Sequence, residues 1–155
     1  IKNADDLVVA QLKLIRTAQK VYLEAKGTYA PEWDSLIVFL NEGVIPIIQR
    51  TEHIEKDDRG QDKIWTEIDT LSMVSAYDSL GTIMGYSKSD MHLLPLIPSN
   101  PDSVKFELRT NARGGEYFIE VKDPDPVNPS RQKGGKLKPL RFGSLAAPST
   151  KGNWE

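Results

Sequence analysis

The sequence contains no cysteine and only two histidines among its 155 residues. The absence of cysteine excludes disulfide bonds, thiolate zinc sites and cysteine nucleophiles. Each histidine has a structural interpretation. His53 lies among acidic residues in a charged stretch, which is typical of a solvated side chain, and His92 between Met91 and Leu93 is typical of partial burial.

A surplus of positive charge is also missing, since the formal net charge at pH 7 is −2. Without a basic surface to attract phosphates, we expect no nucleic-acid partner. No apolar run reaches the roughly 18 residues that a membrane-spanning helix needs, and no signal peptide is present. The chain starts at Ile1 rather than methionine. We interpret this as a processed N-terminus, with any membrane contact made by a segment outside this sequence.

The motifs of the common catalytic sites are absent as well. Gly143-Ser144-Leu145 lacks the second glycine of a nucleophile elbow, and neither histidine belongs to an H-E-x-x-H metal motif. The glycine pairs Gly114-Gly115 and Gly134-Gly135 are not followed by the Lys-Ser or Lys-Thr of a phosphate loop. We therefore expect no catalytic residues, no enzyme activity and no cofactor.

One cation hypothesis comes from the proline-rich stretch near the C-terminus. Asp123, Asp125 and Asn128 offer closely spaced oxygen ligands of the kind that calcium prefers. The alternative is a rigid proline turn with exposed acids. A second and weaker acidic cluster surrounds Gly60, and its members are Asp57, Asp58 and Asp62.

The clearest element that the sequence does contain is a long amphipathic helix over about residues 4–26. Asn3 or Asp5 is expected to cap it, and Gly27 to end it. Its apolar positions recur at helical spacing over a face broad enough to contact both its own sheet and a neighbouring subunit. We expect an assembly interface on this face, formed by Leu7, Val8, Leu12, Ile15 and Tyr22.

The pattern then changes from helical to strand periodicity. A short helix over about residues 34–42, capped by Asp34, precedes a strand-rich region over 44–145 and an extended tail over 146–155. Within that region, residues 44–48 predict an edge strand or an extended lead-in, 55–62 a charged loop, and 63–71 a strand. Residues 104–109 and 117–121 alternate and predict a β-hairpin, and 137–145 a last strand.

These elements predict a single α+β domain over residues 1–155, in which the long helix packs on a mainly antiparallel sheet. A short second helix and a loop-rich C-terminal part complete it. The aromatic residues Tyr29, Trp33 and Trp154 are candidates for contact with a partner, and packing between helix and sheet is the alternative for Tyr29 and Trp33. For Trp154, the alternative is a tail that folds back and buries the ring.

The stretch from Gln11 to Ala30 resembles the exposed half of the first helix in type IV pilins and type II secretion pseudopilins. The similarity lies in Ala18, Tyr22, Gly27, Tyr29 and Leu36, which reproduce Ala-x-x-x-Tyr, Gly-x-Tyr and a short leucine-containing helix. The apolar half-helix and the Phe-Thr-Leu-Ile-Glu start of pilins are not in this sequence. The resemblance implies a pilin-like fold and an extracytoplasmic location, at the cell surface or in the periplasm.

The whole chain also resembles a family of Bacteroidetes envelope proteins of unknown function. The segments that carry this similarity are 15–19, 137–141, 143–145 and 148–154. We therefore expect a non-catalytic structural subunit of a surface filament or envelope assembly, which works by self-association or with other envelope proteins. The alternative is a membrane-tethered periplasmic binding module for a glycan, a peptide or another envelope protein.

Overall fold

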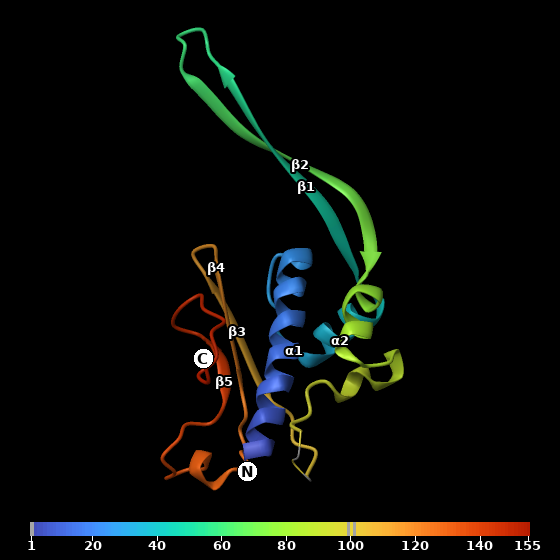
Figure 1. Cartoon of the computed structure of the whole chain (residues 1–155), viewed down its shortest axis with the longest axis vertical. Coiled ribbons are helices and arrows are strands. Elements are labelled where there is room, and N and C mark those ends of the chain that lie inside the picture. The colour runs from blue at the N-terminus through green and yellow to red at the C-terminus, as the bar shows by residue number, and fades with distance from the viewer. Residues whose placement is uncertain (1, 99, 101) are drawn as a thin grey trace.

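The computed structural model describes residues 2–98, 100 and 102–155 and confirms the α+β class. Helix α1 (Lys2–Lys26) lies between a three-stranded sheet on one side and helix α2 (Trp33–Glu42) on the other (Figure 1). A two-stranded sheet of β1 (Val44–Lys56) and β2 (Asp62–Ser75) extends away from this body. The broad apolar face of α1 therefore has two neighbours within its own chain.

Helix α1 begins at Lys2, so Asp5 lies in its first turn and does not cap it. Its apolar residues Val8, Leu12, Ile15 and Ala18 are buried in the core. Gln19 is buried too and fixes the turn that follows the helix, because its amide donates to the Ala30 carbonyl at 3.1 Å and accepts from the Ala30 N–H at 2.9 Å. This pairing satisfies polar groups that would otherwise be costly to bury.

Helix α2 starts at Trp33 behind Glu32, whose side chain makes no capping hydrogen bond. The prediction that Asp34 caps this helix is wrong, because Asp34 lies in its first turn, where a carboxylate favours the helix dipole instead. Leu36, Phe39 and Leu40 are buried. The ring of Phe39 meets Tyr22 of α1 edge to face, with centroids 5.1 Å apart. Helix α2 thus covers part of the α1 surface that the sequence analysis assigned to another subunit.

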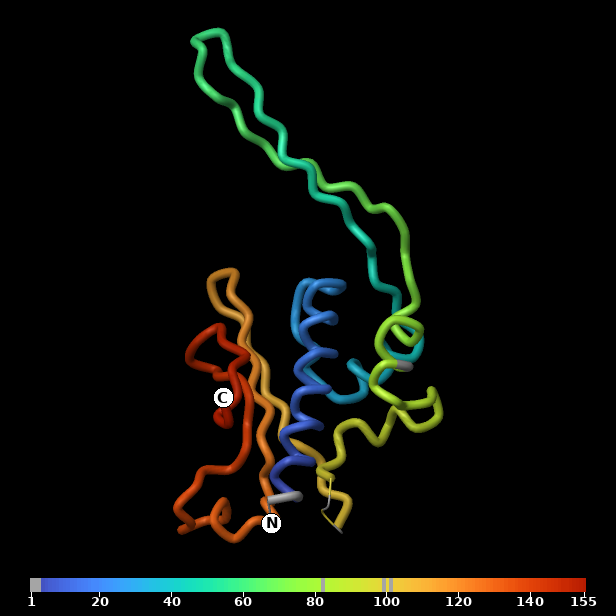
Figure 2. Tube along the Cα trace, viewed as in Figure 1, coloured from blue at the N-terminus to red at the C-terminus, as the bar shows by residue number. Residues whose placement is uncertain are grey.

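Strands β1 (Val44–Lys56) and β2 (Asp62–Ser75) form a long antiparallel hairpin. We call it the arm. Its inner end joins α2, and the rest stands clear of the body as a twisted ribbon (Figures 1 and 2). The predicted strand over 44–48 therefore continues to Lys56. The predicted charged loop over 55–62 is reduced to a short turn, in which Asp57 Oδ1 accepts from the N–H groups of Arg59 and Gln61.

The chain returns from the arm through short helical segments: η1 (Tyr77–Gly81), α3 (Thr82–Met84) and η2 (Lys88–Leu93). Residues 82–93 therefore contain helical turns. The amide of buried Gln11 on α1 holds them to the body, since its Nε2 donates to the Leu94 carbonyl at 2.6 Å and lies 3.0 Å from the Tyr86 hydroxyl. Met91, Leu94 and Ile97 complete this side of the core.

The second sheet has the order β3–β4–β5, from β3 (Glu107–Arg113), β4 (Glu116–Lys122) and β5 (Arg141–Ser144). It is antiparallel throughout, and the Gly114-Gly115 turn joins β3 to β4 with both residues at positive φ, as a tight hairpin requires. Val121, Ile119 and Phe142 face the core. The predicted hairpin is confirmed, although β3 starts three residues later than expected.

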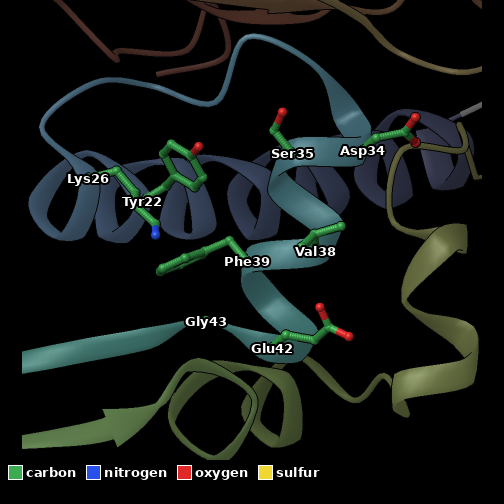
Figure 3. A pocket seen from close by; sticks show the side chains of 8 residues that line it. All are labelled: Tyr22, Lys26, Asp34, Ser35, Val38, Phe39, Glu42 and Gly43. Atoms are coloured by element: carbon green, nitrogen blue, oxygen red, sulfur yellow. The ribbon is translucent and has the colours of Figure 1, made fainter.

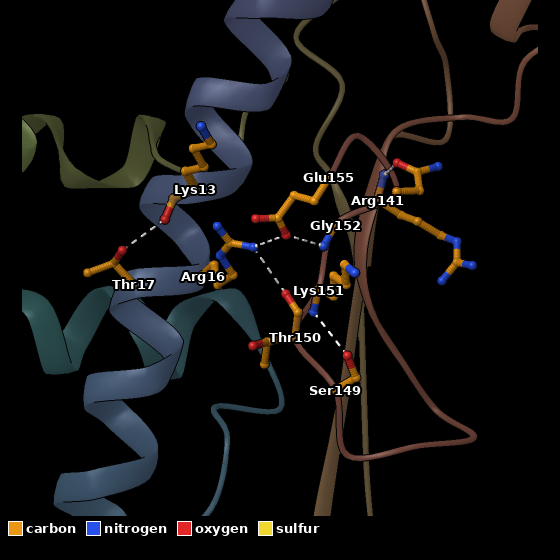
Figure 4. Close-up of polar contacts among 10 residues, drawn as sticks. Lys13, Arg16, Thr17, Arg141, Ser149, Thr150, Lys151, Gly152 and Glu155 are labelled. Carbon is orange, nitrogen blue, oxygen red and sulfur yellow. Dashed lines mark hydrogen bonds and ion pairs between the residues drawn. The ribbon is translucent and has the colours of Figure 1, made fainter.

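The tail over 146–155 is not extended away from the body. Gly152 bridges to Phe142 of β5, and Asn153 N–H donates to the Arg141 carbonyl at 3.0 Å. Trp154 packs against the core, and the Arg16 guanidinium lies 5.5 Å from its ring centroid. Glu155 accepts from Arg16 Nη1 at 2.8 Å and from the Gly152 N–H at 2.7 Å (Figure 4). These two contacts hold the pKa of Glu155 below its usual range.

Candidate interaction surface

The arm extends away from the body, and its outer part packs on no other element in the described part of the chain (Figure 1). Each β1 residue pairs with a β2 residue in one register from Lys56–Asp62 to Ile48–Thr70, and a bulge follows at Ile47. Side chains alternate between the two faces of a strand, and directly paired residues share a face. The arm therefore has two distinct faces, and the register assigns every side chain to one of them.

One face of the arm is rich in isoleucine. We call the paired rows Ile48–Thr70, Arg50–Ile68, Glu52–Thr66 and Ile54–Ile64 the isoleucine face, and the charged Lys56–Asp62 pair at the tip of the arm lies on the same side. Ile54, Ile64 and Ile68 are exposed by 65%, 60% and 59%, and Ile48 by 41%. An antiparallel sheet that alternates apolar and polar residues normally packs its apolar face on a core. Here that face is open to solvent.

The opposite face is polar and makes its own side-chain contacts. His53 stacks on Trp65, with ring centroids 5.1 Å apart and planes 17° from parallel. His53 Nε2 also lies 2.8 Å from Glu67 Oε2, and Gln49, Asp69, Glu55 and Lys63 lie on the same face. His53 is thus a half-buried member of a stacked pair on strand β1 with Glu67 as its ion-pair partner, rather than the fully solvated side chain that the sequence predicts.

Two hollows lie where the arm meets the body. The larger, of about 610 Å³, opens between α1 and α2, with Tyr22, Lys26, Asp34, Ser35, Val38 and Phe39 around it (Figure 3). The smaller, of about 450 Å³, is lined by Glu24 of α1 and by Ile45, Pro46, Ile48 and Arg50 of β1. The root of the isoleucine face therefore continues into the second hollow.

The predicted assembly interface on α1 does not form one exposed surface. Val8 is 5% exposed, and Leu12 and Ile15 are fully buried, in a helix that lies between α2 and the three-stranded sheet (Figure 1). Tyr22 is half-buried against Phe39, and Leu7 is 49% exposed. The apolar face of α1 is therefore part of the protein core, and only residues at its edges, such as Leu7, are exposed to another molecule.

The candidate partner residues Tyr29, Trp33 and Trp154 all pack partly against the core. Trp33 Nε1 donates to the Phe106 carbonyl at 3.0 Å, and partial burial raises the pKa of the Tyr29 hydroxyl. Of the two outcomes considered for Trp154, the structure has the one in which the tail folds back. These residues do not assemble an exposed aromatic patch.

The calcium candidates have other partners. Asp123 is buried, and its Oδ1 accepts from the Asp125 N–H at 2.9 Å. Burial raises the pKa of Asp123, helped by the nearby Asp125 and Asp5 charges. Asn128 Oδ1 accepts from the Ser130 N–H, while its amide donates to Asp5, which also accepts from Arg131. Asp123 and Asn128 thus order the proline-rich turn, and Asn128 docks it on Asp5 of α1. The Asp125 carboxylate instead accepts from Asn100 Nδ2 at 3.2 Å.

Within the described part of the chain, no group of three or more His, Asp or Glu side chains could hold a metal ion. Among the same residues, no helix has the length and apolar character needed to cross a membrane. Comparisons with protein-family models, with curated proteins and with solved structures find no match.

Sequence reasoning missed the isoleucine face. Gln49 to Glu55 is dominated by polar and charged residues, which hides a strand with one polar face. A usable signal was present, since Ile54 and Ile64 stand three residues outside the Asp57–Gln61 turn on either side. Apolar residues placed symmetrically around a turn indicate a hairpin with one apolar face.

Proposed function

We propose that the protein is a non-catalytic assembly subunit that self-associates through the isoleucine face of its arm. The observation that carries this proposal is a long two-stranded sheet whose apolar face is uncovered. A two-stranded hairpin is at best marginally stable alone in water, and three or more strands or a packing partner are needed. Exposed large apolar side chains that gather on one face are also a mark of protein–protein contact.

A second copy of the chain is the partner that we infer. It necessarily carries an apolar strip of the same length and width. The seven residues from Ile48 to Ile54 span about 24 Å, so the isoleucine face of the two-stranded ribbon covers roughly 240 Å². Two such faces in contact would bury about 480 Å² in total, which is below the roughly 1,200–2,000 Å² of stable specific interfaces. We therefore expect weak and reversible association.

The location of such an assembly rests on the sequence resemblance. The first helix resembles that of pilins and pseudopilins, so we propose an extracytoplasmic assembly in a bacterial envelope. The interface differs from that expectation, because the helix face is buried and the arm is open. The arm, rather than α1, is therefore the element that we assign to assembly.

The test replaces Ile54 and Ile64 by serine (Ile54→Ser and Ile64→Ser) in the full chain. Both side chains are exposed by at least 60%, so we expect the body to unfold at an unchanged temperature. Removing two apolar contacts from each copy should raise the dissociation constant about a hundredfold or more, as measured by sedimentation equilibrium.

The matched control replaces Glu55 and Lys63 by serine. These residues form the adjacent pair but lie on the opposite face, so association should be unchanged. A native chain that stays monomeric at all concentrations would contradict the proposal. It would leave the hollow between α1 and α2 as the candidate site, and with it the binding-module function.

A further inference from the structure

From the charges on the isoleucine face, we infer that two arms pack face to face and antiparallel, about a twofold axis that passes between the Arg50 and Glu52 rows. This inference rests on the proposed self-association and adds its geometry. Arg50 and Glu52 are the two charged side chains in the central rows of this face, and both are exposed. Their neighbours on either side are the isoleucine rows.

A twofold axis that lies in the interface and crosses the strands places β1 of one copy over β1 of the other. Rows at equal distances on either side of the axis then face each other. With the axis between the Arg50 and Glu52 rows, each Arg50 faces Glu52 of the second copy. Each Ile48 faces Ile54 of the second copy, because these residues lie one row further out in opposite directions.

The same register also gives favourable contacts between the two β2 strands. Ile68 faces Thr66 of the second copy, and Ile64 faces Thr70, so both isoleucines meet threonine methyl groups. A twofold contact of this kind is self-complementary, as closed dimers require. The contact uses every row of the isoleucine face and leaves neither charge against an apolar side chain.

Other registers of the two arms would produce unfavourable contacts. An axis through the Arg50 row or the Glu52 row would bring like charges together, and a shift by one full row would set a charge against isoleucine. A parallel arrangement would place β1 over β2, so that Arg50 faced Ile68 and Glu52 faced Thr66. It would also bring the two bodies to the same end, whereas the antiparallel arrangement keeps them apart (Figure 2).

The proposal predicts a specific pattern for charge reversal. The variant Arg50→Glu sets two glutamates against each other at both symmetric positions, and Glu52→Arg sets two arginines against each other there. Each single variant should raise the dissociation constant about tenfold at low salt, and the effect should shrink in roughly 1 M salt. Sedimentation equilibrium measures these values, and circular dichroism checks that each variant is folded.

Two combinations should restore association to near the native value. The double variant Arg50→Glu with Glu52→Arg exchanges the charges and recreates both ion pairs. An equimolar mixture of the two single variants should form heterodimers, because each contact then joins a glutamate to an arginine. Native-like association in both, together with weak association in each single variant, is the expected result.

Different results would overturn the proposed self-association and the proposed antiparallel geometry. A native chain that does not associate would overturn both the proposed function and this geometry. Association that is lost in Ile54→Ser with Ile64→Ser but is unaffected by both charge reversals would overturn the geometry alone. Single variants that weaken association without rescue by the mixture would also overturn it.

Discussion

A variant with a shortened arm is expected to be a folded monomer. Residues 49–69 are removed, and Ile48 is joined to Thr70 by Asn-Gly, a two-residue connection that suits a tight hairpin. Ile48 and Thr70 are already paired, so the join preserves the register of the inner arm. Because the removed segment stands clear of the body apart from Arg50 at the hollow beside Glu24, the unfolding temperature should change little, while self-association is lost (Figure 1). Thermal denaturation and sedimentation equilibrium measure the two outcomes.

The matched control removes only the tip of the arm. Residues 56–62 are replaced by Asn-Gly between Glu55 and Lys63, which keeps all four rows of the isoleucine face. Association of this control should equal that of the native chain. If removal of the tip abolished association as fully as removal of the outer arm, the contact would lie in the charged turn rather than on the isoleucines.

The second large effect is expected in the core. Leu12→Ala should lower the free energy of unfolding by about 3 kcal/mol, because it removes a fully buried side chain and leaves a cavity between α1 and its neighbours. Urea denaturation followed by circular dichroism measures this loss. Association of the folded fraction should be unchanged, since Leu12 does not reach the surface.

Leu7→Ala is the control on the same helix. Leu7 is 49% exposed, so its truncation should cost about 0.5 kcal/mol or less. The comparison separates the two roles considered for the apolar face of α1. If Leu12→Ala kept native stability but lost association, the helix would be the assembly element, and our assignment of the arm would be wrong.

The helices were predictable because local patterns define them. Apolar spacing gave α1 almost to its ends, and Gly27 ended it, with φ at 84°. The same pattern could not say what covers the apolar face. A broad apolar stripe is equally satisfied by another subunit and by a second helix of the same chain. That choice depends on where α2 packs, which is a tertiary property.

The β3–β4 hairpin was predictable for a similar reason, since Gly114-Gly115 separates two alternating segments. The arm was predicted only in part, as strands over 44–48 and 63–71, because the rest of β1 is polar on one face and charged in its centre. Trp154 shows a third limit. The Trp154 ring lies against Arg16, which is distant in sequence, and against Gly152, which gives no local signal. The sequence therefore left two outcomes for Trp154 open: burial by a tail that folds back, or contact with a partner.

The measurement that tests the central claim most directly is amide hydrogen exchange of the native chain at increasing protein concentration. The account predicts that exchange slows in β1 and β2 around Ile54 and Ile64 as copies associate, while buried α1 amides keep the same rates. Protection that increases along α1 with no change in the arm would contradict it.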